Sequence, residues 1–266
     1  MSPFQYCRRS GPLLVSMPHV GTDIPDDIAA GMTEAGRAMP DTDWYVDRLY
    51  DFLDELGAST IASTHSRYVI DLNRPPDDEN LYPGQDTPGL VPIDTFDHQP
   101  IYQAGAEPDA DEIARRLERY WRPYHEKLRS TLDELVEEHG VAFLFEAHSI
   151  RSEVPRLWRG RLPDLNLGTG DGSSCAAGIA AAMLEAAEDS ADYTAVLNGR
   201  FKGGYITRRY GEPARNIHAV QLELSQRTYM TEDDAFELRA DLADQVRPVL
   251  RRLVEVFVGS GLVGGR

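Results

Sequence analysis

The chain has 266 residues, of which 41% are hydrophobic and 27% are charged, and this is the composition of a globular protein that can bury a sizeable core. The formal net charge of −17 disfavours nucleic acid and anionic membrane surfaces as partners. A small molecule is therefore the expected partner, and an anionic one would need arginines gathered locally around it.

The two cysteines, Cys7 and Cys175, have neither the spacing of a metal site nor that of a disulfide framework. We find no signal-peptide pattern and no apolar run of transmembrane length, so we expect a cytoplasmic protein. No linker, internal repeat or low-complexity tract divides the sequence. We therefore predict a single α/β domain that spans residues 1–266.

The first predicted strand is Pro12–Ser16, and His19 lies in the loop just past its end. The next predicted element is a helix from Trp44 to Leu56, which Gly57 ends. Aspartates crowd the start of this helix, among them Asp43 and Asp47. Capping and the helix dipole explain one acidic residue there more readily than several.

Ser59–Ser63 and Tyr68–Leu72 are the second and third predicted strands. Asn73 and Arg74 follow the third strand, and Pro75 prevents regular structure from continuing. Both side chains are therefore expected at a strand end, where they could bind a substrate carboxylate in a two-point contact.

Residues 77–103 are rich in proline, glycine and aspartate, and loops of this length in a compact domain are usually functional. We interpret this segment as a wall or lid over a site. Apolar residues then recur at helical spacing from Asp109 to His139, with Pro123 expected at a kink or a break. We interpret His125 and His139 as surface or packing residues of this helix.

Val141–Phe145 is a continuous apolar run, which predicts a strand buried on both faces. Ligands of open α/β sheets bind in the crevice beyond the carboxyl ends of the strands. His148 occupies that position after its strand, as His19 does after the first, so the two histidines are candidates for one shared site. The polar side chains that follow the run are Glu146, His148, Ser149 and Arg151.

The remaining pattern alternates helices with strands, which predicts a three-layer α/β sandwich with a mixed, mainly parallel sheet. Arg200 follows one of these strands, and Glu223 lies near the end of another. The predicted elements are a loop at 162–169, a helix at Ser174–Ala187, strands at Thr194–Leu197 and His218–Leu224, and a long helix at Asp233–Val258.

Two histidines, one carboxylate and an open position for water form the ligand set of a catalytic zinc. His19 and His148 offer the nitrogens, and a further carboxylate near the water would act as general base, for which Glu223 is the natural candidate. The ligand carboxylate would come from one of three aspartates, Asp23, Asp43 or Asp47.

Five sequence motifs, taken together, resemble those of a known protein family. They are Ser16–Gly21, Asp71–Pro75, Glu146–Ile150, Asn198–Gly204 and Gln221–Ser225. As a set they resemble the N-formylglutamate amidohydrolase (N-formylglutamate deformylase) family, which is similar in fold to the zinc carboxypeptidases. The resemblance implies hydrolysis of N-formyl-L-glutamate to formate and L-glutamate, late in histidine degradation, with Zn²⁺ or another divalent metal as cofactor.

The resemblance also implies roles for individual residues. His19 and His148 match metal ligands of the carboxypeptidase pattern, and Glu223 matches the base. Carboxypeptidases carry a glutamate ligand three residues after the first histidine, where this chain has Thr22. The third ligand must come from elsewhere, and we predict Asp43.

The family pattern also includes residues that bind the carboxylates of the substrate. Asn73 and Arg74 match the segment that binds one carboxylate, and the second would be bound by Arg67, Arg151 or Arg200. Two alternatives stand beside this prediction, namely a deacylase of another N-acyl amino acid and a non-catalytic anion-binding protein on the same fold. Measuring bound metal would distinguish the anion-binding protein, which would hold no zinc, from an enzyme.

Overall fold

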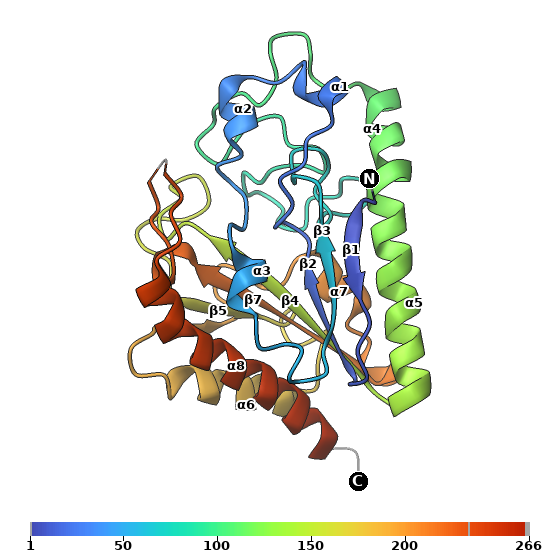
Figure 1. Ribbon diagram of the computed structural model, residues 1–266, viewed down its shortest axis with the longest axis vertical. Coiled ribbons are helices and arrows are strands. Elements are labelled where there is room, and N and C mark those ends of the chain that lie inside the picture. The colour runs from blue at the N-terminus through green and yellow to red at the C-terminus, as the bar shows by residue number, and fades with distance from the viewer. Residues whose placement is uncertain (1, 234, 264–266) are drawn as a thin grey trace.

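A seven-stranded mixed sheet lies at the centre of the computed structural model, which describes residues 2–233 and 235–263 (Figure 1). Within this part of the chain the strand order is β1-β3-β2-β4-β7-β5-β6. The inner strands β3, β2, β4 and β7 are parallel, whereas β1 is antiparallel to β3 and β5 is antiparallel to β7. The strands are β1 (Phe4–Cys7), β2 (Leu13–Met17), β3 (Ser59–Ser63), β4 (Ala142–Ile150), β5 (Leu165–Gly168), β6 (Ala195–Leu197) and β7 (Ile217–Ser225).

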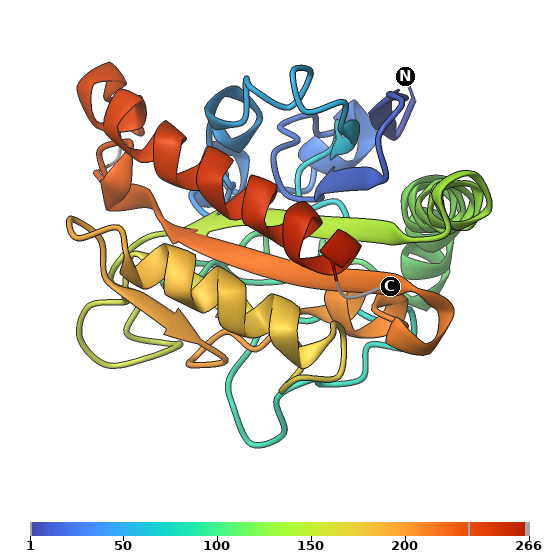
Figure 2. The same ribbon diagram turned by 90° about the horizontal axis from the view of Figure 1, so that it is seen from below.

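Helices cover both faces of the sheet, which confirms the predicted three-layer α/β sandwich. One apolar core joins the sheet to α3, α6 and α8, and α6 and α8 run side by side (Figure 2). A second core joins the opposite face to α5 and α7. The helices are α1 (Asp26–Ala29), α2 (Glu34–Ala38), α3 (Val46–Leu49), α4 (Ala110–Arg116), α5 (Arg122–His139), α6 (Ala177–Glu188), α7 (Tyr205–Tyr210) and α8 (Ala240–Val263), with a π-helical turn η1 (Leu117–Trp121) and 3₁₀ turns η2 (Pro213–Arg215) and η3 (Gln226–Thr228).

The central strands β4 and β7 carry the site because their polar ends lie side by side. All nine residues of β4 are buried, as the apolar run predicts. The parallel register pairs Glu146 with Gln221 and His148 with Glu223. Alternate residues of a strand share a face, so these four side chains project from the same side of the sheet.

The long helical segment after residue 109 is confirmed, with a π-helical turn at the predicted break. Asp109 caps its N-terminus by accepting a hydrogen bond from the backbone of Glu112 at 2.9 Å. The backbone N–H of Arg122 donates to Leu117, which is the wider spacing of a π-turn. Pro123 follows at once, and it has no N–H to continue the α-helical pattern.

Two predictions from apolar runs are wrong. Residues Tyr68–Leu72 form turns instead of a strand, although they are buried in the second core. Their backbone N–H groups bond locally or to the long loop, as in the bond from Asp71 N–H to Leu90 O at 2.8 Å, and some of their carbonyls accept from helix side chains. Periodicity alone does not distinguish such a buried turn from a short buried strand. The helix predicted for Trp44–Leu56 is helical only over α3 and continues as turns.

Other boundaries differ from the sequence prediction. Strand β1 was not predicted, and β5 lies where a loop was expected, at 162–169. The last helix begins at Ala240 instead of Asp233, and position 234 of that prediction lies outside the described residues. None of the described helices combines the length and the apolar character that crossing a membrane requires.

Candidate active site

Three buried side chains from distant parts of the chain converge beyond the carboxyl ends of β2 and β4. His19 lies in the loop after β2, His148 lies near the end of β4, and Asp43 precedes α3. One ligand atom from each lies within 4.8 Å of the others. The Asp43 N–H donates to the His19 carbonyl at 3.1 Å, which joins the two loops. Gly21 permits the first loop to approach its neighbour, because a Cβ there would lie 2.4 Å from the His65 carbonyl oxygen.

The ring nitrogens of the two histidines are arranged as a metal site requires. Oδ2 of Asp43 lies 3.0 Å from Nδ1 of His148 and 3.7 Å from Nδ1 of His19. Nε2 of His19 lies 2.7 Å from Asp71 Oδ1, and this nitrogen carries the proton because the carboxylate only accepts. Nδ1 of His19 is then free to bind a cation, as in the carboxylate–histidine pairs behind many zinc ions. The donor set therefore fits a zinc-type metal.

Electrostatics within this cluster favour charged forms. Burial opposes ionisation of Asp43, but hydrogen bonds from His148 and His19 outweigh it and lower the pKa of the carboxyl. Burial would likewise lower the pKa of His148, yet the carboxylates of Asp43, Glu146 and Glu223 raise it to about 10. Without a cation, the imidazole thus provides positive charge to the surrounding carboxylates.

The other candidate aspartates lie away from this cluster. Asp47 is exposed on α3, and Asp23 forms an isolated backbone bridge with His65. Of the three aspartates predicted as candidates, Asp43 is the one that the structure places beside both histidines.

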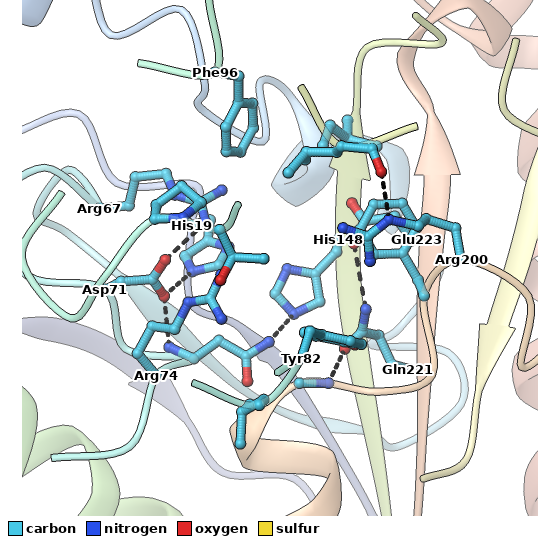
Figure 3. A pocket seen from close by; sticks show the side chains of 18 residues that line it. His19, Arg67, Asp71, Arg74, Tyr82, Phe96, His148, Arg200, Gln221 and Glu223 are labelled. Atoms are coloured by element: carbon cyan, nitrogen blue, oxygen red, sulfur yellow. Dashed lines mark hydrogen bonds and ion pairs between the residues drawn. The ribbon is translucent and has the colours of Figure 1, made fainter. Parts of the chain in front are cut away.

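Glu223 lies on β7 directly beside His148 and faces the same pocket (Figure 3). Its side chain is buried, and burial together with the charge of Asp43 raises the pKa of the carboxyl to about 8. Gln221 donates from Nε2 to Glu223 Oε2 at 3.2 Å, and its own Oε1 accepts the Gly204 N–H at 2.7 Å. The amide therefore fixes the orientation of the glutamate.

Three arginines line the pocket, and they differ in how they are paired. Arg67 donates to Asp71 at 2.7 Å and so belongs to the network behind His19. Arg74 and Arg200 form no ion pair with any described carboxylate, and burial lowers the pKa of both guanidinium groups. Nε of Arg200 donates to the Leu157 carbonyl at 2.7 Å, but neither guanidinium has a carboxylate partner among the described residues, so the two partly buried cations create a site for anionic groups.

Several residues of the central motif have other roles. Arg151 does not line this pocket, and its guanidinium pairs with Asp97 at 2.7 Å. The Ser149 hydroxyl lies on the opposite face of β4 and accepts from Tyr229 at 2.7 Å. Glu146 is fully buried, with Oε2 3.4 Å from Nε2 of His148.

The long loop at 77–103 forms one wall of the pocket, as its composition predicts. Its side chains on the wall are Leu81, Tyr82, Thr87, Pro88 and Phe96. The Tyr82 ring lies between the guanidinium groups of Arg200 and Arg208, at 5.3 Å and 5.2 Å. Such cation–π contacts hold the loop against the arginine side of the pocket.

Among the pocket residues that were not predicted as site residues, Gln221 and Tyr82 contact the proposed functional side chains. Gln221 precedes Glu223 by two positions in an alternating strand, so the strand period alone would have indicated it. Tyr82 lies in an irregular loop, and nothing in the sequence pattern distinguishes it from its neighbours.

Comparison with known proteins agrees with this geometry. The family model for N-formylglutamate amidohydrolase matches residues 11–230. The chain is 50% identical to an N-formylglutamate deformylase of Pseudomonas putida over 250 residues, which cover 94% of this chain and 93% of that one. It is 52% identical to an N-formylglutamate deformylase of Pseudomonas aeruginosa, with 94% of each chain covered.

Solved structures show the same relationship. A crystal structure of N-formylglutamate amidohydrolase from Ralstonia eutropha matches with a TM-score of 0.82 and 26% identity, over 99% of this chain and 98% of that one. A protein of Agrobacterium tumefaciens shares the fold with a TM-score of 0.71 and 20% identity, over 99% of this chain and 96% of that one. By its sequence and by its fold, this chain belongs to the N-formylglutamate amidohydrolase family.

Proposed function

We propose that this protein is a single-domain, metal-dependent amidohydrolase that converts N-formyl-L-glutamate and water to formate and L-glutamate. The observation that carries the proposal is one pocket lined by both histidines of the His-Asp-His cluster, a buried glutamate and two guanidinium groups without a described carboxylate partner. Its membership of the family and its curated relatives, which are named as deformylases of this compound, support the substrate. The proposed setting is histidine degradation in the cytoplasm.

His19, Asp43 and His148 would hold the metal, for which zinc is our proposal and another divalent ion is an alternative. A zinc ion with such ligands supplies Lewis acidity, which polarises a carbonyl group and lowers the pKa of water. Asp71 assists by fixing the His19 ring through its Nε2 proton.

Glu223 is the proposed general base. It would take a proton from the attacking water and deliver it to the amide nitrogen as the C–N bond of the formamide breaks. Burial and the charge of Asp43 raise the pKa of the Glu223 carboxyl, which makes the carboxylate a stronger base. Gln221 keeps one oxygen of Glu223 engaged, so the other can face the water.

The substrate carries two carboxylates, and the pocket offers two unpaired guanidinium groups for them. We assign one carboxylate to Arg74 with the neighbouring Asn73 and the other to Arg200. Arg67 is already paired with Asp71, and Arg151 lies outside the pocket, so both suit this role less well than Arg200. The formyl group would then point towards His148 and Glu223.

Formate release from a panel of substrates tests the proposal. We expect efficient hydrolysis of N-formyl-L-glutamate, weak hydrolysis of N-formyl-L-glutamine, and loss of activity on chelation that zinc restores. Faster turnover of N-acetyl-L-glutamate would favour the deacylase alternative. Substrate binding without turnover in a protein that contains no metal would favour the anion-binding alternative and would refute the proposal.

A further inference from the structure

The segment Leu72–Arg74, which carries two of the proposed substrate-binding residues, belongs to no strand or helix. It therefore lacks the ladder bonds that hold His148 and Glu223 in place. Its three consecutive carbonyl groups are nevertheless all within hydrogen-bond distance of a neighbouring element. Buried backbone carbonyls need such partners, and here the partners come from the helices on one side of the sheet.

Two side chains at the π-helical turn supply the outer bonds. The indole Nε1 of Trp121 donates to the carbonyl of Arg74 at 3.0 Å. Nε2 of His125 lies 2.9 Å from the carbonyl of Leu72, so this nitrogen must carry the proton. Its Nδ1 is then an acceptor for the Tyr210 hydroxyl at 2.9 Å. Burial lowers the pKa of His125 to about 3, which keeps this neutral tautomer at neutral pH.

Packing makes the two side chains a rigid unit. The rings of Trp121 and His125 are stacked, with centroids 3.6 Å apart and an interplanar angle of 22°. Both residues are buried, at 7% and 4% exposure. Helix α7 completes the enclosure, because the Tyr205 N–H donates to the carbonyl of Asn73 at 3.3 Å and the Ile206 N–H donates to its side-chain oxygen at 2.8 Å.

Helical spacing explains how one helix contacts both carbonyls. Trp121 and His125 are four residues apart, so they lie on the same helix face and both reach the Leu72–Arg74 segment. Trp121 is the last residue of the π-helical turn, and π-turns inside α-helices occur frequently at functional sites. Trp121 also belongs to the second core, together with Leu72, Tyr124 and Leu128.

We propose that Trp121 and His125 are positioning residues that hold the Leu72–Arg74 backbone and thereby fix the direction in which Arg74 reaches the substrate carboxylate. This inference rests on the proposed function, because it assigns Arg74 to substrate binding. Neither side chain lies in the bond-breaking part of the pocket, so their loss should weaken binding of the carboxylate and spare the chemical step.

Replacing Trp121 by Phe tests the inference, because the ring stack is largely kept while the N–H is lost. We expect KM for N-formyl-L-glutamate to rise about 3- to 10-fold, as for one lost hydrogen bond, with kcat within about 2-fold of wild type. The dissociation constant of L-glutamate, measured by calorimetry, should rise by the same factor. Trp44→Phe is the matched control, since the indole nitrogen of Trp44 has no hydrogen-bond partner in the described part of the chain.

The double variant Trp121→Phe/Arg74→Ala separates positioning from general destabilisation. If Trp121 acts through Arg74, the double variant has the KM of Arg74→Ala alone, whereas independent effects multiply. His125→Phe, which keeps a ring but loses the bond to Leu72, should behave like Trp121→Phe. The inference is overturned if KM is unchanged in both single variants, or if the two effects on KM multiply fully in the double variant. In either case, turnover by the wild type leaves the proposed function intact. A wild type that neither hydrolyses the substrate nor binds glutamate overturns both.

Discussion

Glu223 illustrates how a single side chain can be assigned by its surroundings. It is buried, its pKa is raised to about 8, and it lies beside His148 in the strand register. We expect Glu223→Gln to retain bound metal and substrate affinity but to lose about 10²- to 10⁴-fold in kcat, the usual size of a general acid–base contribution. Steady-state kinetics with metal analysis would show this, and the exposed Glu188→Gln is the control. Wild-type kcat in Glu223→Gln would contradict the assignment.

Arg200 should determine the preference for a charged substrate side chain. If its guanidinium binds the side-chain carboxylate, Arg200→Met should lower kcat/KM for N-formyl-L-glutamate about 10- to 100-fold, the size expected for a lost charge-assisted hydrogen bond. The value for N-formyl-L-glutamine should change much less. Arg151→Met, outside the pocket, is the matched control. Equal losses of kcat/KM on both substrates would mean that Arg200 does not bind the side-chain carboxylate.

For individual residues, the sequence predicts most of the candidate site. It leaves open which aspartate completes the metal site and which arginine binds the second substrate carboxylate. His19, His148 and Glu223 could be predicted because each lies at the end of a predicted strand. Asp43 was predicted as the third ligand ahead of Asp23 and Asp47, but helix capping also explains an aspartate there, so the structure was needed to show which one lies beside both histidines. Arg200 also required it, because the pairing of Arg151 with Asp97 depends on contacts between distant loops.

His125 on helix α5 should make the folded state less stable in acid. The pKa of this histidine is about 3 in the folded chain, below its ordinary value of 6.5, because the site is buried. The folded state therefore binds fewer protons than the unfolded state, and stability falls as the pH falls through 6.5 towards 3. Between pH 7 and pH 5 the loss due to this group is about 2 kcal/mol.

Urea unfolding of wild type and His125→Phe at the two pH values would measure that loss. The variant has no titrating group at this position, so its free energy of unfolding should depend less on pH by about 2 kcal/mol. Parallel curves for wild type and His125→Phe would mean that His125 is not held neutral.

Elements with strong periodicity could be predicted, and those fixed by distant contacts could not. The segment from Asp109 to His139 and strand β7 have a clear period, and both are found. Tyr68–Leu72 has the composition of a strand, but its hydrogen bonds go to local residues, the long loop and helix side chains instead of a neighbouring strand. Strands β1 and β5 are antiparallel additions of four residues each, too short for a pattern to reveal.

For the whole molecule, two cores on opposite faces of the sheet make the fold independent of the proposed metal. Both cores consist of apolar side chains from helices and strands, and none of the three cluster residues belongs to either. Chelation should therefore abolish activity and lower Tm by the lost binding free energy, yet leave the far-ultraviolet circular dichroism spectrum unchanged. Loss of the helical signal on chelation would show that the ion is part of the folding core.

The parallel pairing of β2 with β4 also bears on how the protein is made in the cell. The proposed metal ligands lie at positions 19, 43 and 148, so a ribosome must synthesise more than half of the 266 residues before the last of them exists. The pairing of Ser16 with Glu146 brings together the two chain segments that carry the histidines. The nascent N-terminal segment therefore has no complete metal site. The proposed site can select and bind its ion only after the sheet has assembled.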